Sequence, residues 1–400
     1  MMAYIINIGD EVLYGKVLNG NGAFLGYELE RLGIAIEKIV VIKDDVNTVV
    51  DEIKAFLISD SKILITTGGL GVTNDDITKK AISLALQKSL EKNEEIFKMF
   101  YNKKVISTNA LMLSLFPKTA QIINNEWGIA SGFVIKHNNK IIISLVGPPF
   151  EMEPMFNKAI KYLPVAPLAS SIKEYTLMGK SEAEFEKELL NLKKEYQSIS
   201  INPYCSIGKI RYIIKGNLAR NNLFEKCINN FKEIMSHYII GEGNILIEEE
   251  VYRLLQAKNY TISFGESCTG GLLAAKMINV PGASCVINES IISYSNNAKT
   301  KYFNVSQSTI EKYGVVSSNV VDEMVQGLFL LTKSEVCVAV SGIAGPEGGS
   351  ANKPVGLVYY AIKIKEAIYI ENKLFSGNRN LIRERAAMWI FYRIWYYLQE

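Results

Sequence analysis

The stretch Tyr260-Thr-Ile-Ser-Phe-Gly-Glu-Ser-Cys-Thr-Gly-Gly-Leu-Leu-Ala-Ala-Lys-Met-Ile278 joins a strand pattern to a helix pattern through a turn of small residues. Its start is mostly β-branched and aromatic, and its end is rich in alanine and leucine. The turn is predicted to bring Ser267, Cys268 and Thr269 to a helix N-terminus, where free N–H groups and the helix dipole favour negative charge. Ser267 is then either a nucleophile or an ordinary helix N-cap, and the stretch alone leaves both interpretations open.

The composition of the 400-residue chain, with 48% hydrophobic and 21% charged residues, indicates a globular protein of two or three domains. A formal net charge of +3 is nearly neutral for this length, so no nucleic-acid partner is expected. No signal-peptide pattern opens the chain, and no apolar run reaches the roughly 18 residues of a membrane span. The five cysteines include no Cys-x-x-Cys pair, which favours reduced thiols and a cytoplasmic location.

Only two histidines, His137 and His237, occur in the chain, and neither lies in a glycine-rich turn. A Ser-His-Asp triad, a Cys-His pair or a histidine-ligated zinc site is therefore hard to build. A nucleophile in this protein needs a base of another kind, and lysine and tyrosine are the natural candidates.

The first 165 residues alternate strand patterns (4–8, 34–42, 62–67) with helix patterns (23–32, 49–58), which predicts a doubly wound α/β domain with a parallel sheet. The third strand leads into Gly68-Gly-Leu-Gly-Val-Thr-Asn-Asp-Asp-Ile-Thr78, whose glycines allow backbone N–H groups to approach an anion. Asp75 and Asp76 are suited to a divalent cation that bridges phosphate oxygens. An Asp-rich helix start, with Thr73 and Asp76 as a capping box, is the alternative.

Five segments of this region together resemble the N-terminal, molybdopterin-binding-type domain of the CinA family. They are 9–15, 19–25, 67–78, 127–133 and 145–152. The resemblance implies metal-dependent hydrolysis of ADP-ribose or a related pyrophosphate, with a divalent metal as cofactor, in a homodimeric protein. The implied nucleotide-binding residues are Glu11, Gly68, Gly69, Gly71 and Thr73, and the implied metal ligands are Asp75 and Asp76.

Two departures from the family pattern concern this first domain. Val72 stands where a proline is expected after the glycines, and residues 108–116 lack the expected basic and glutamine residues. We therefore favour a binding and dimerisation module over a working pyrophosphatase.

Residues 164–171 are rich in proline, alanine and serine, as is typical of a linker. Within 166–243 the pattern predicts a small α+β domain, with a helix that begins in a capping box of Ser181 and Glu184. This domain is similar to the KH-like linker domain of CinA proteins, including Met178-Gly-Lys-Ser-Glu182. A Gly-x-x-Gly loop with basic flanks is absent from the sequence, so a spacer role is predicted instead of RNA binding.

Residues 244–400 place polar side chains after three predicted strands. Ser267 follows the first strand, and Tyr294 and Lys299 follow a strand over 290–294. A glycine-rich loop over 341–349 follows a strand over 336–340. Ligands of open α/β sheets bind beyond the carboxyl ends of the strands, so these loops are expected to share one crevice. Residues 353–356 and 377–383 add positive charge that suits a phosphate, although each of these side chains also has an ordinary structural interpretation.

The order and spacing of six segments make this block similar to the nicotinamide mononucleotide deamidase domain of CinA proteins. They are 266–271, 294–299, 314–317, 341–346, 353–356 and 375–379. The resemblance implies an α/β domain that hydrolyses nicotinamide mononucleotide to nicotinate mononucleotide and ammonia without a cofactor. The implied partners are small nucleotides.

The resemblance also assigns roles in this domain. Ser267 attacks the carboxamide, Lys299 takes the serine proton, and Tyr294 orients or relays it. N–H groups at the helix start after Ser267 stabilise the oxyanion. The substrate-binding residues are Thr269, Gly270, Ser341, Gly342, Gly345, Arg379 and Arg383.

Three alternatives remain beside this assignment. Cys268 is a competing nucleophile, because a helix N-terminus lowers a thiol pKa, but no histidine is placed to assist it and we rank Ser267 first. A metal-dependent pyrophosphatase centred on Asp75 and Asp76 is a second enzyme hypothesis. A non-enzymatic, competence-associated protein is the third.

Overall fold

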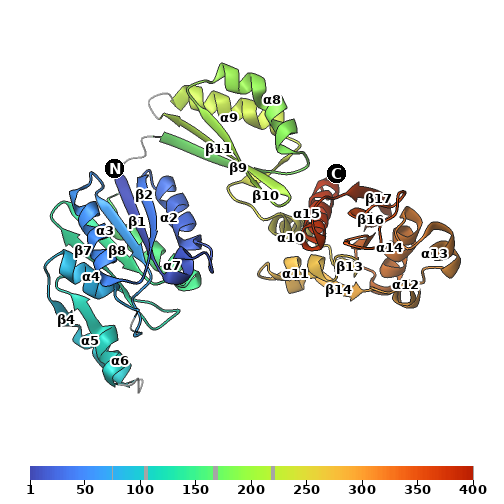
Figure 1. Ribbon diagram of the computed structural model, residues 1–400. Helices are drawn as coiled ribbons and strands as arrows, with labels where there is room; N and C mark the ends of the chain where they lie inside the picture. Colours follow the sequence, from blue (N-terminus) through green and yellow to red (C-terminus); the bar gives the residue numbers. More distant parts are fainter. Residues whose placement is uncertain (74, 103–106, 165–169, 218–220, 400) are drawn as a thin grey trace. The chain divides into compact units, whose positions relative to one another are not determined.

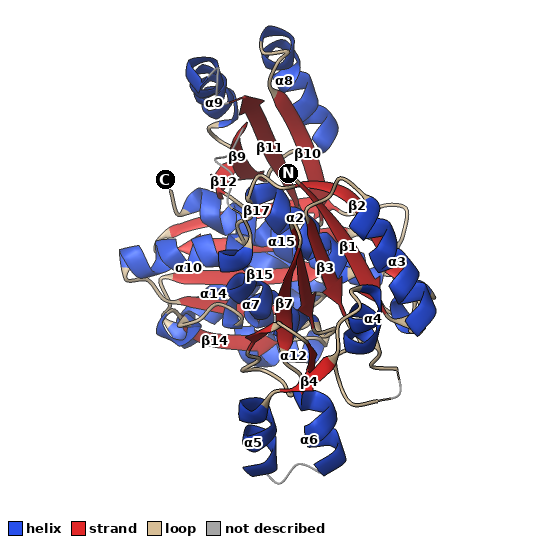
Figure 2. Ribbon diagram, turned by 90° about the vertical axis from the view of Figure 1, so that its left-hand side faces the viewer, coloured by secondary structure: helices blue, strands red, loops and turns tan. Residues whose placement is uncertain are grey.

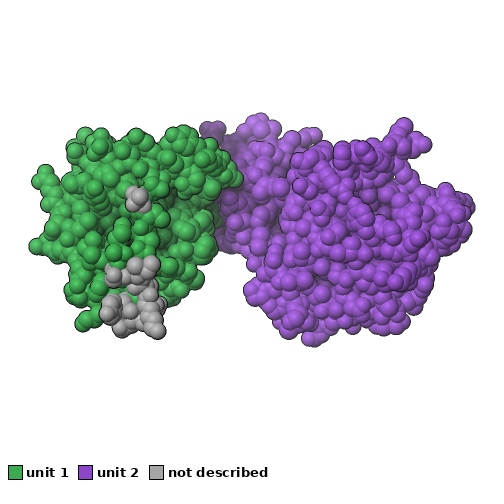
Figure 3. Space-filling model, turned by 60° about the horizontal axis from the view of Figure 1, so that its bottom comes forward, with its two compact units in different colours: residues 1–170 green, residues 171–400 purple. Residues whose placement is uncertain are grey.

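The fold is that of a computed structural model, which describes residues 1–73, 75–102, 107–164, 170–217 and 221–399. The chain forms two compact units, 1–170 and 171–400, which Figure 3 shows in green and purple. The first predicted domain boundary, and most of the linker predicted at 164–171, fall on 165–169, outside the described residues. Within the described ranges, none of the helices has the length and apolar character needed to cross a bilayer.

The N-terminal unit is built on a six-stranded sheet in the order β2-β1-β3-β8-β7-β6. The strands are β1 Met2–Ile8, β2 Ala35–Ile42, β3 Ile63–Thr67, β8 Lys140–Leu145, β7 Gly132–His137 and β6 Gln121–Ile123. The first four strands in this order are parallel, whereas the pairs β8–β7 and β7–β6 are antiparallel. Every residue of β3 is buried, which explains its unbroken apolar and threonine sequence.

Helices cover both faces of this sheet. α2 (Gly20–Arg31) and α7 (Pro149–Ala159) contact each other on one face, and α3 (Val46–Ile58) and α4 (Thr78–Ala85) contact each other on the other face (Figure 1). The predicted doubly wound α/β fold is therefore confirmed, with two antiparallel pairings that the sequence pattern did not indicate. The remaining elements are α1 Asp10–Leu13, β4 Leu90–Lys92, α5 Glu94–Asn102, α6 Ser107–Ser114, β5 Leu115–Pro117 and η1 Ile160–Tyr162.

The second unit begins with an α+β module, whose sheet has the order β10-β11-β9-β12. Its elements are β9 Ser170–Leu177, α8 Glu182–Glu195, β10 Ser200–Ser206, β11 Lys209–Asn217, α9 Asn221–Met235 and β12 Ile239–Glu242. The predicted capping box is present, because Ser181 and Glu184 exchange hydrogen bonds at the start of α8. Phe185, Tyr212 and Phe231 lie in the buried core of the module.

The rest of this unit is built on a five-stranded sheet in the order β14-β13-β15-β16-β17, of which Figure 2 labels β14, β15 and β17. Its strands are β13 Ile262–Glu266, β14 Ile287–Ile292, β15 Val336–Gly342, β16 Leu357–Ile364 and β17 Ala367–Leu374. β14, β13 and β15 are parallel, and β16 and β17 add antiparallel pairings. The carboxyl ends of the three parallel strands therefore meet at one edge, as the sequence analysis required.

Two groups of helices flank this sheet. α10 (Ile247–Lys258), α11 (Leu272–Ile278) and α15 (Arg379–Tyr397) pack together. The second group consists of α12 Asn296–Phe303, α13 Gln307–Tyr313 and α14 Ser318–Thr332, and a short η3 spans Ala283–Cys285. The α/β fold class predicted for the C-terminal part is thus confirmed.

Candidate active site

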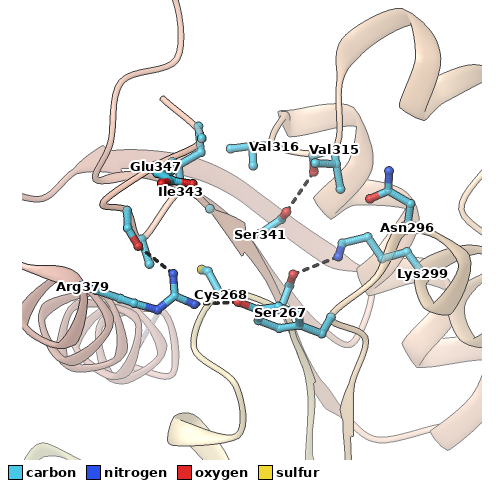
Figure 4. A pocket seen from close by; sticks show the side chains of 15 residues that line it. Ser267, Cys268, Asn296, Lys299, Val315, Val316, Ser341, Ile343, Glu347 and Arg379 are labelled. Carbon is cyan, nitrogen blue, oxygen red and sulfur yellow. Dashed lines mark hydrogen bonds between the residues drawn. The ribbon is translucent and has the colours of Figure 1, made fainter. Parts of the chain in front are cut away.

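A cavity of about 250 Å³ lies at the carboxyl edge of β13, β14 and β15 (Figure 4). It brings together most of the polar residues selected from the sequence of this part. The lining residues are Ser267, Cys268, Tyr294, Asn296, Lys299, Val315, Val316, Ser341, Gly342, Ile343, Ala344, Gly345, Glu347, Gly348 and Arg379. Asn296 and Glu347 also line the cavity but were not predicted as site residues, because the motifs that contain them were assigned roles through other residues.

The centre of the cavity is a contact between a lysine and a serine. Lys299 Nζ donates to Ser267 Oγ at 2.9 Å and to the carbonyl of Ser293 at 2.7 Å. Only 8% of Ser267 and 1% of Lys299 are exposed. Ser295 caps α12 by accepting from the N–H of Ala298, which places Lys299 in the first turn of that helix, beside the strand ends. Figure 4 shows the lysine reaching toward the serine from the neighbouring segment.

Burial changes the acidity of both candidate groups beside Ser267. It lowers the pKa of Lys299 to about 8, because the charged ammonium is desolvated, while the nearby Cys268 opposes the shift. It raises the pKa of the Cys268 thiol to about 12. A neutral amine is therefore accessible near neutral pH, and a thiolate is not. The expectation that the helix start would lower the thiol pKa is wrong, since desolvation outweighs the charge of Lys299 and the nearby N–H groups.

The turn that carries Ser267 differs from the predicted helix cap. α11 begins at Leu272, and its N-cap is Gly271 with φ 90°, so Ser267, Cys268 and Thr269 do not cap it. The buried Glu266 takes that place, because its carboxylate accepts from the N–H groups of Gly271, Leu273 and Ala274 at 3.0, 3.2 and 3.0 Å. The N-cap interpretation of Ser267 is therefore wrong.

Glu266 was missed by sequence reasoning, although a charged residue at the end of a buried strand was an available signal. Its side chain fixes the loop between strand and helix and leaves Ser267 free of any capping role. The predicted oxyanion donors, the N–H groups at the helix start after Ser267, therefore include three that are bonded to this carboxylate instead.

Arg379 crosses the cavity from the first residue of α15. Its Nη1 donates to the carbonyl of Gly345 at 2.7 Å, and its Nη2 donates to the hydroxyl of Tyr294 at 2.6 Å. Tyr294 is 61% exposed, two residues beyond the end of β14. The structure therefore joins Tyr294 to Arg379, while Lys299 is joined to Ser267 and to the Ser293 carbonyl.

The other predicted arginine occupies a different position. Arg383 donates from Nε to the carbonyl of Cys268 at 3.2 Å and from Nη2 to the carbonyl of Thr269 at 2.7 Å. It holds the turn and is not among the residues that line the cavity. Thr269 and Gly270 are also outside the lining; Thr269 Oγ1 is buried without a hydrogen-bond partner among the described residues.

The third strand end builds the opposite wall of the cavity. Ser341 Oγ donates to the carbonyl of Val315 at 2.9 Å, so it anchors the loop that precedes α14. Gly342 is required by close packing, because a Cβ there would meet Cys268 Sγ at 3.0 Å. Gly345 has φ 76°, a conformation that favours glycine. Lys353, expected to add charge for a phosphate, instead donates to the carbonyls of Tyr313 and Val316 at 2.6 and 2.7 Å.

A second cavity, of about 480 Å³, lies in the N-terminal unit at the glycine-rich loop. Of the predicted residues, Glu11, Gly68, Gly69, Gly71, Asp75 and Asp76 line it, and Asp44 and Glu151 add carboxylates. Asp44, packed near Asp10, Glu11 and Asp75, has a raised pKa, mainly because of burial. Thr73 lies outside the lining.

The carboxylate of Asp76 is already bonded within its own loop. It accepts from the N–H of Gly71 at 2.6 Å, and from the N–H and hydroxyl of Thr73 at 2.7 Å each. α4 begins at Thr78 with Ile77 as N-cap, so the alternative capping box of Thr73 and Asp76 does not start this helix. Among the described residues, no group of three or more His, Cys, Asp or Glu side chains is arranged to hold a metal ion. Asp75 and Asp76 both line the cavity, and the predicted cation that bridges phosphate oxygens would draw on these two carboxylates and the substrate.

Comparisons with known proteins cover both units. A family model described as "CinA C-terminal domain" matches residues 245–397, and one described as "Probable molybdopterin binding domain" matches residues 4–165. A putative competence-damage inducible protein of Clostridium botulinum (strain 657 / Type Ba4) is 37% identical over an alignment of 397 residues, which covers 96% of each chain.

Two further similarities concern a relative and a solved structure. A CinA-like protein of Pseudothermotoga lettingae is 33% identical over an alignment of 398 residues, which covers 98% of this chain and 97% of the relative. The crystal structure of a CinA superfamily protein from Klebsiella pneumoniae is 28% identical, with a TM-score of 0.38, and covers 38% of this chain and 96% of the other.

Proposed function

The chain belongs to the CinA family, and from this premise we propose that its C-terminal part hydrolyses the carboxamide of nicotinamide mononucleotide. The products are nicotinate mononucleotide and ammonia. The observation that supports this proposal most directly is the 2.9 Å contact between the buried Lys299 amine and Ser267 Oγ. A serine beside a lysine of lowered pKa is a known way to activate a hydroxyl nucleophile without histidine.

The proposed reaction has two halves. Neutral Lys299 takes the proton of Ser267 as Oγ bonds to the carboxamide carbon, and the carbonyl electrons move to the oxygen. The lysine then returns the proton to the amide nitrogen, the C–N bond breaks, and ammonia leaves an ester on Ser267. Water then attacks the ester carbon as Lys299 takes its proton, the bond from that carbon to Ser267 Oγ breaks, and Lys299 returns the proton to Oγ as nicotinate mononucleotide leaves. The bond from Lys299 to the Ser293 carbonyl keeps the amine directed at the serine throughout.

The oxyanion of the tetrahedral adduct needs hydrogen-bond donors near Ser267. Because Glu266 holds the N–H groups of residues 271, 273 and 274, we assign this task to the N–H groups of Cys268 and Thr269. Cys268 lines the cavity, and Thr269 follows it directly in the same turn.

Arg379 is the proposed anchor for the phosphate of the substrate. It lines the cavity, and a guanidinium binds phosphate oxygens as a planar fork. Tyr294 positions Arg379 through the 2.6 Å hydrogen bond, which differs from the relay role implied by the family resemblance. Arg383 holds the turn through its hydrogen bonds to the carbonyls of Cys268 and Thr269, and so helps to position Ser267.

The test is ammonia release from nicotinamide mononucleotide by the purified chain, with EDTA present. We expect Ser267→Ala to abolish release and Cys268→Ala to retain most of it. The reverse result would remove Ser267 from the mechanism. If wild type releases no ammonia, the amidase proposal fails as a whole.

A second candidate function belongs to the N-terminal cavity, whose glycine-rich loop and size suit a nucleotide. We infer a nucleotide-binding and dimerisation role rather than pyrophosphate hydrolysis, because Asp76 is bonded to its own loop. The same protein is incubated with ADP-ribose, with and without Mg²⁺ or Mn²⁺. Metal-dependent AMP would support the pyrophosphatase instead, and inactivity on both substrates would support the non-enzymatic, competence-associated role.

A further inference from the structure

A crevice of about 470 Å³ lies between the α+β module and the C-terminal sheet of the second unit. It is separate from the amidase cavity, since the two share no lining residue. Its walls come from the start of α8, the β10–β11 hairpin, the end of β17 and the middle of α15. The Met178–Glu182 motif, which the proposed amidase function leaves unexplained, reaches one wall through Gly179, Lys180, Ser181 and Glu182.

Two glycines allow the module to approach α15 closely. A Cβ at Gly208 would meet Met388 Cβ at 2.6 Å, and a Cβ at Gly179 would meet the Tyr392 hydroxyl at 2.5 Å. Both glycines have positive φ, 76° and 105° respectively, where other residues are strained. The crevice therefore lies at a closely packed interface between the α+β module and α15.

Four cationic side chains line this crevice: Lys180, Lys209, Lys373 and Arg385. Lys180 pairs with Glu188, and Lys209 donates to Asn244 Oδ1 and to the Ile245 carbonyl, each at 2.8 Å. Lys373 lies over the ring of Trp389, and Arg385 Nη1 donates to Ser376 Oγ at 2.8 Å. In the part of the chain that the structure describes, neither Lys373 nor Arg385 forms an ion pair.

The two carboxylates of the crevice already have other partners. Glu184 accepts from Ser181 in the capping box, and Glu182 accepts from the Cys205 thiol at 3.1 Å. Burial lowers the pKa of both Lys209 and Lys373, because it desolvates their positive charges, while the nearby Glu184 opposes the shift of Lys373. A bound anion would stabilise the partly desolvated charges of Lys209 and Lys373, because it replaces the interactions that they lost with water.

We propose that this crevice is a further ligand site, which binds a phosphorylated small molecule of nucleotide size. The excess of cations over carboxylates selects a phosphate, and Arg385 and Lys373 are its principal contacts. The volume lies in the range of small-molecule sites and is larger than a lone phosphate needs. Phe375 and Trp389 supply apolar surface for the rest of the ligand.

The experiment uses the full chain carrying Ser267→Ala, so its outcome does not depend on amidase activity. AMP and inorganic phosphate are the probes, and hydrogen–deuterium exchange locates binding. We expect AMP to protect residues 205–210 and 373–385, with a weaker effect of phosphate. Lys373→Met and Arg385→Met should each raise the Kd of AMP at this site by about tenfold, the usual size for loss of a charge-assisted contact.

Two further variants keep the result interpretable. Lys187→Met removes an exposed charge from the same module outside the crevice, and it should leave AMP binding unchanged. Ser206→Phe fills the crevice from an exposed hairpin residue without removing a charge, and it should abolish the protection. Protection confined to the N-terminal glycine loop or to the amidase cavity would overturn the proposal. So would equal protection by phosphate and AMP, or binding that Ser206→Phe leaves intact.

Discussion

The side-chain nitrogen of Lys299 lies 2.9 Å from the hydroxyl oxygen of Ser267, and both side chains are buried. A second bond, to the carbonyl of Ser293, fixes the direction of the amine. The chain thus combines a nucleophile, Ser267, with a base, Lys299. Because burial lowers the pKa of Lys299 to about 8, the charge of this base changes near neutral pH.

Amidase activity should rise with pH through the pKa of Lys299. With that pKa at about 8, the neutral fraction is about one-tenth at pH 7 and half at pH 8, so kcat/KM should increase roughly fivefold between them. The rate should level off above pH 9. A pH–rate profile on nicotinamide mononucleotide checks this, and a flat profile from pH 6 to 9 would exclude Lys299 as the base. Lys299→Arg, which stays charged, should lose about 10²–10⁴ in rate across the whole range.

Thiol reagents should leave the proposed activity intact. The Cys268 thiol is buried and its pKa is raised to about 12, so little thiolate exists at neutral pH. Iodoacetamide at pH 7.5 should modify the exposed Cys285 well before Cys268. Peptide mass spectrometry, sampled together with ammonia release, makes the comparison. Inactivation that follows labelling of Cys268 without labelling elsewhere would contradict the burial argument.

Glu266→Gln should weaken both the turn and the reaction. The amide offers one acceptor oxygen where the carboxylate receives three N–H groups, so at least one buried donor loses its partner. The expected cost is about 1–3 kcal/mol in the free energy of unfolding, with a fall in kcat as Ser267 shifts. Chemical denaturation and steady-state kinetics measure the two effects. Glu366→Gln, at an exposed turn, is the matched control, and equal behaviour of the two variants would contradict the capping role.

Arg379→Lys should separate binding of the phosphate from the chemistry. A lysine cannot reproduce the planar fork, so the KM for nicotinamide mononucleotide should rise about tenfold while kcat changes less. Nicotinamide riboside, which has no phosphate, should show no such increase. Arg253→Lys, on an exposed ion pair of α10, serves as the control. An equal loss on both substrates would show that Arg379 acts on the reacting groups or on the fold instead.

The fold class could be predicted from the sequence, because the patterns that indicate strands and turns depend on residues close together in the chain. Apolar runs such as 62–67 and 336–340 correspond closely to β3 and β15, and glycine-rich loops follow both strands. The antiparallel strands β16 and β17 were not predicted, although the turn of residues 365–366 joins them as a hairpin; only the pairing of β15 with β16 spans a longer stretch of the chain.

The functional site was predictable only in part. Residues that follow strand ends, such as Ser267, Lys299 and Ser341, meet because the sheet topology brings those ends together. The roles of Glu266 and Arg383 depend on which N–H group or carbonyl each long side chain reaches, and spacing in the sequence does not determine this.

Helix α15 packs against both parts of the second unit, and this limits how the unit can unfold. The apolar core beneath the C-terminal sheet contains Met178 and Ile240 from the α+β module together with Met388 and Tyr392 from α15. The module and the sheet therefore share one apolar core. Neither part can unfold without exposing apolar side chains of the other to water. Residues 171–400 should melt in a single cooperative transition. A truncated protein that begins at residue 244, and so lacks the module, should expose an apolar surface and self-associate.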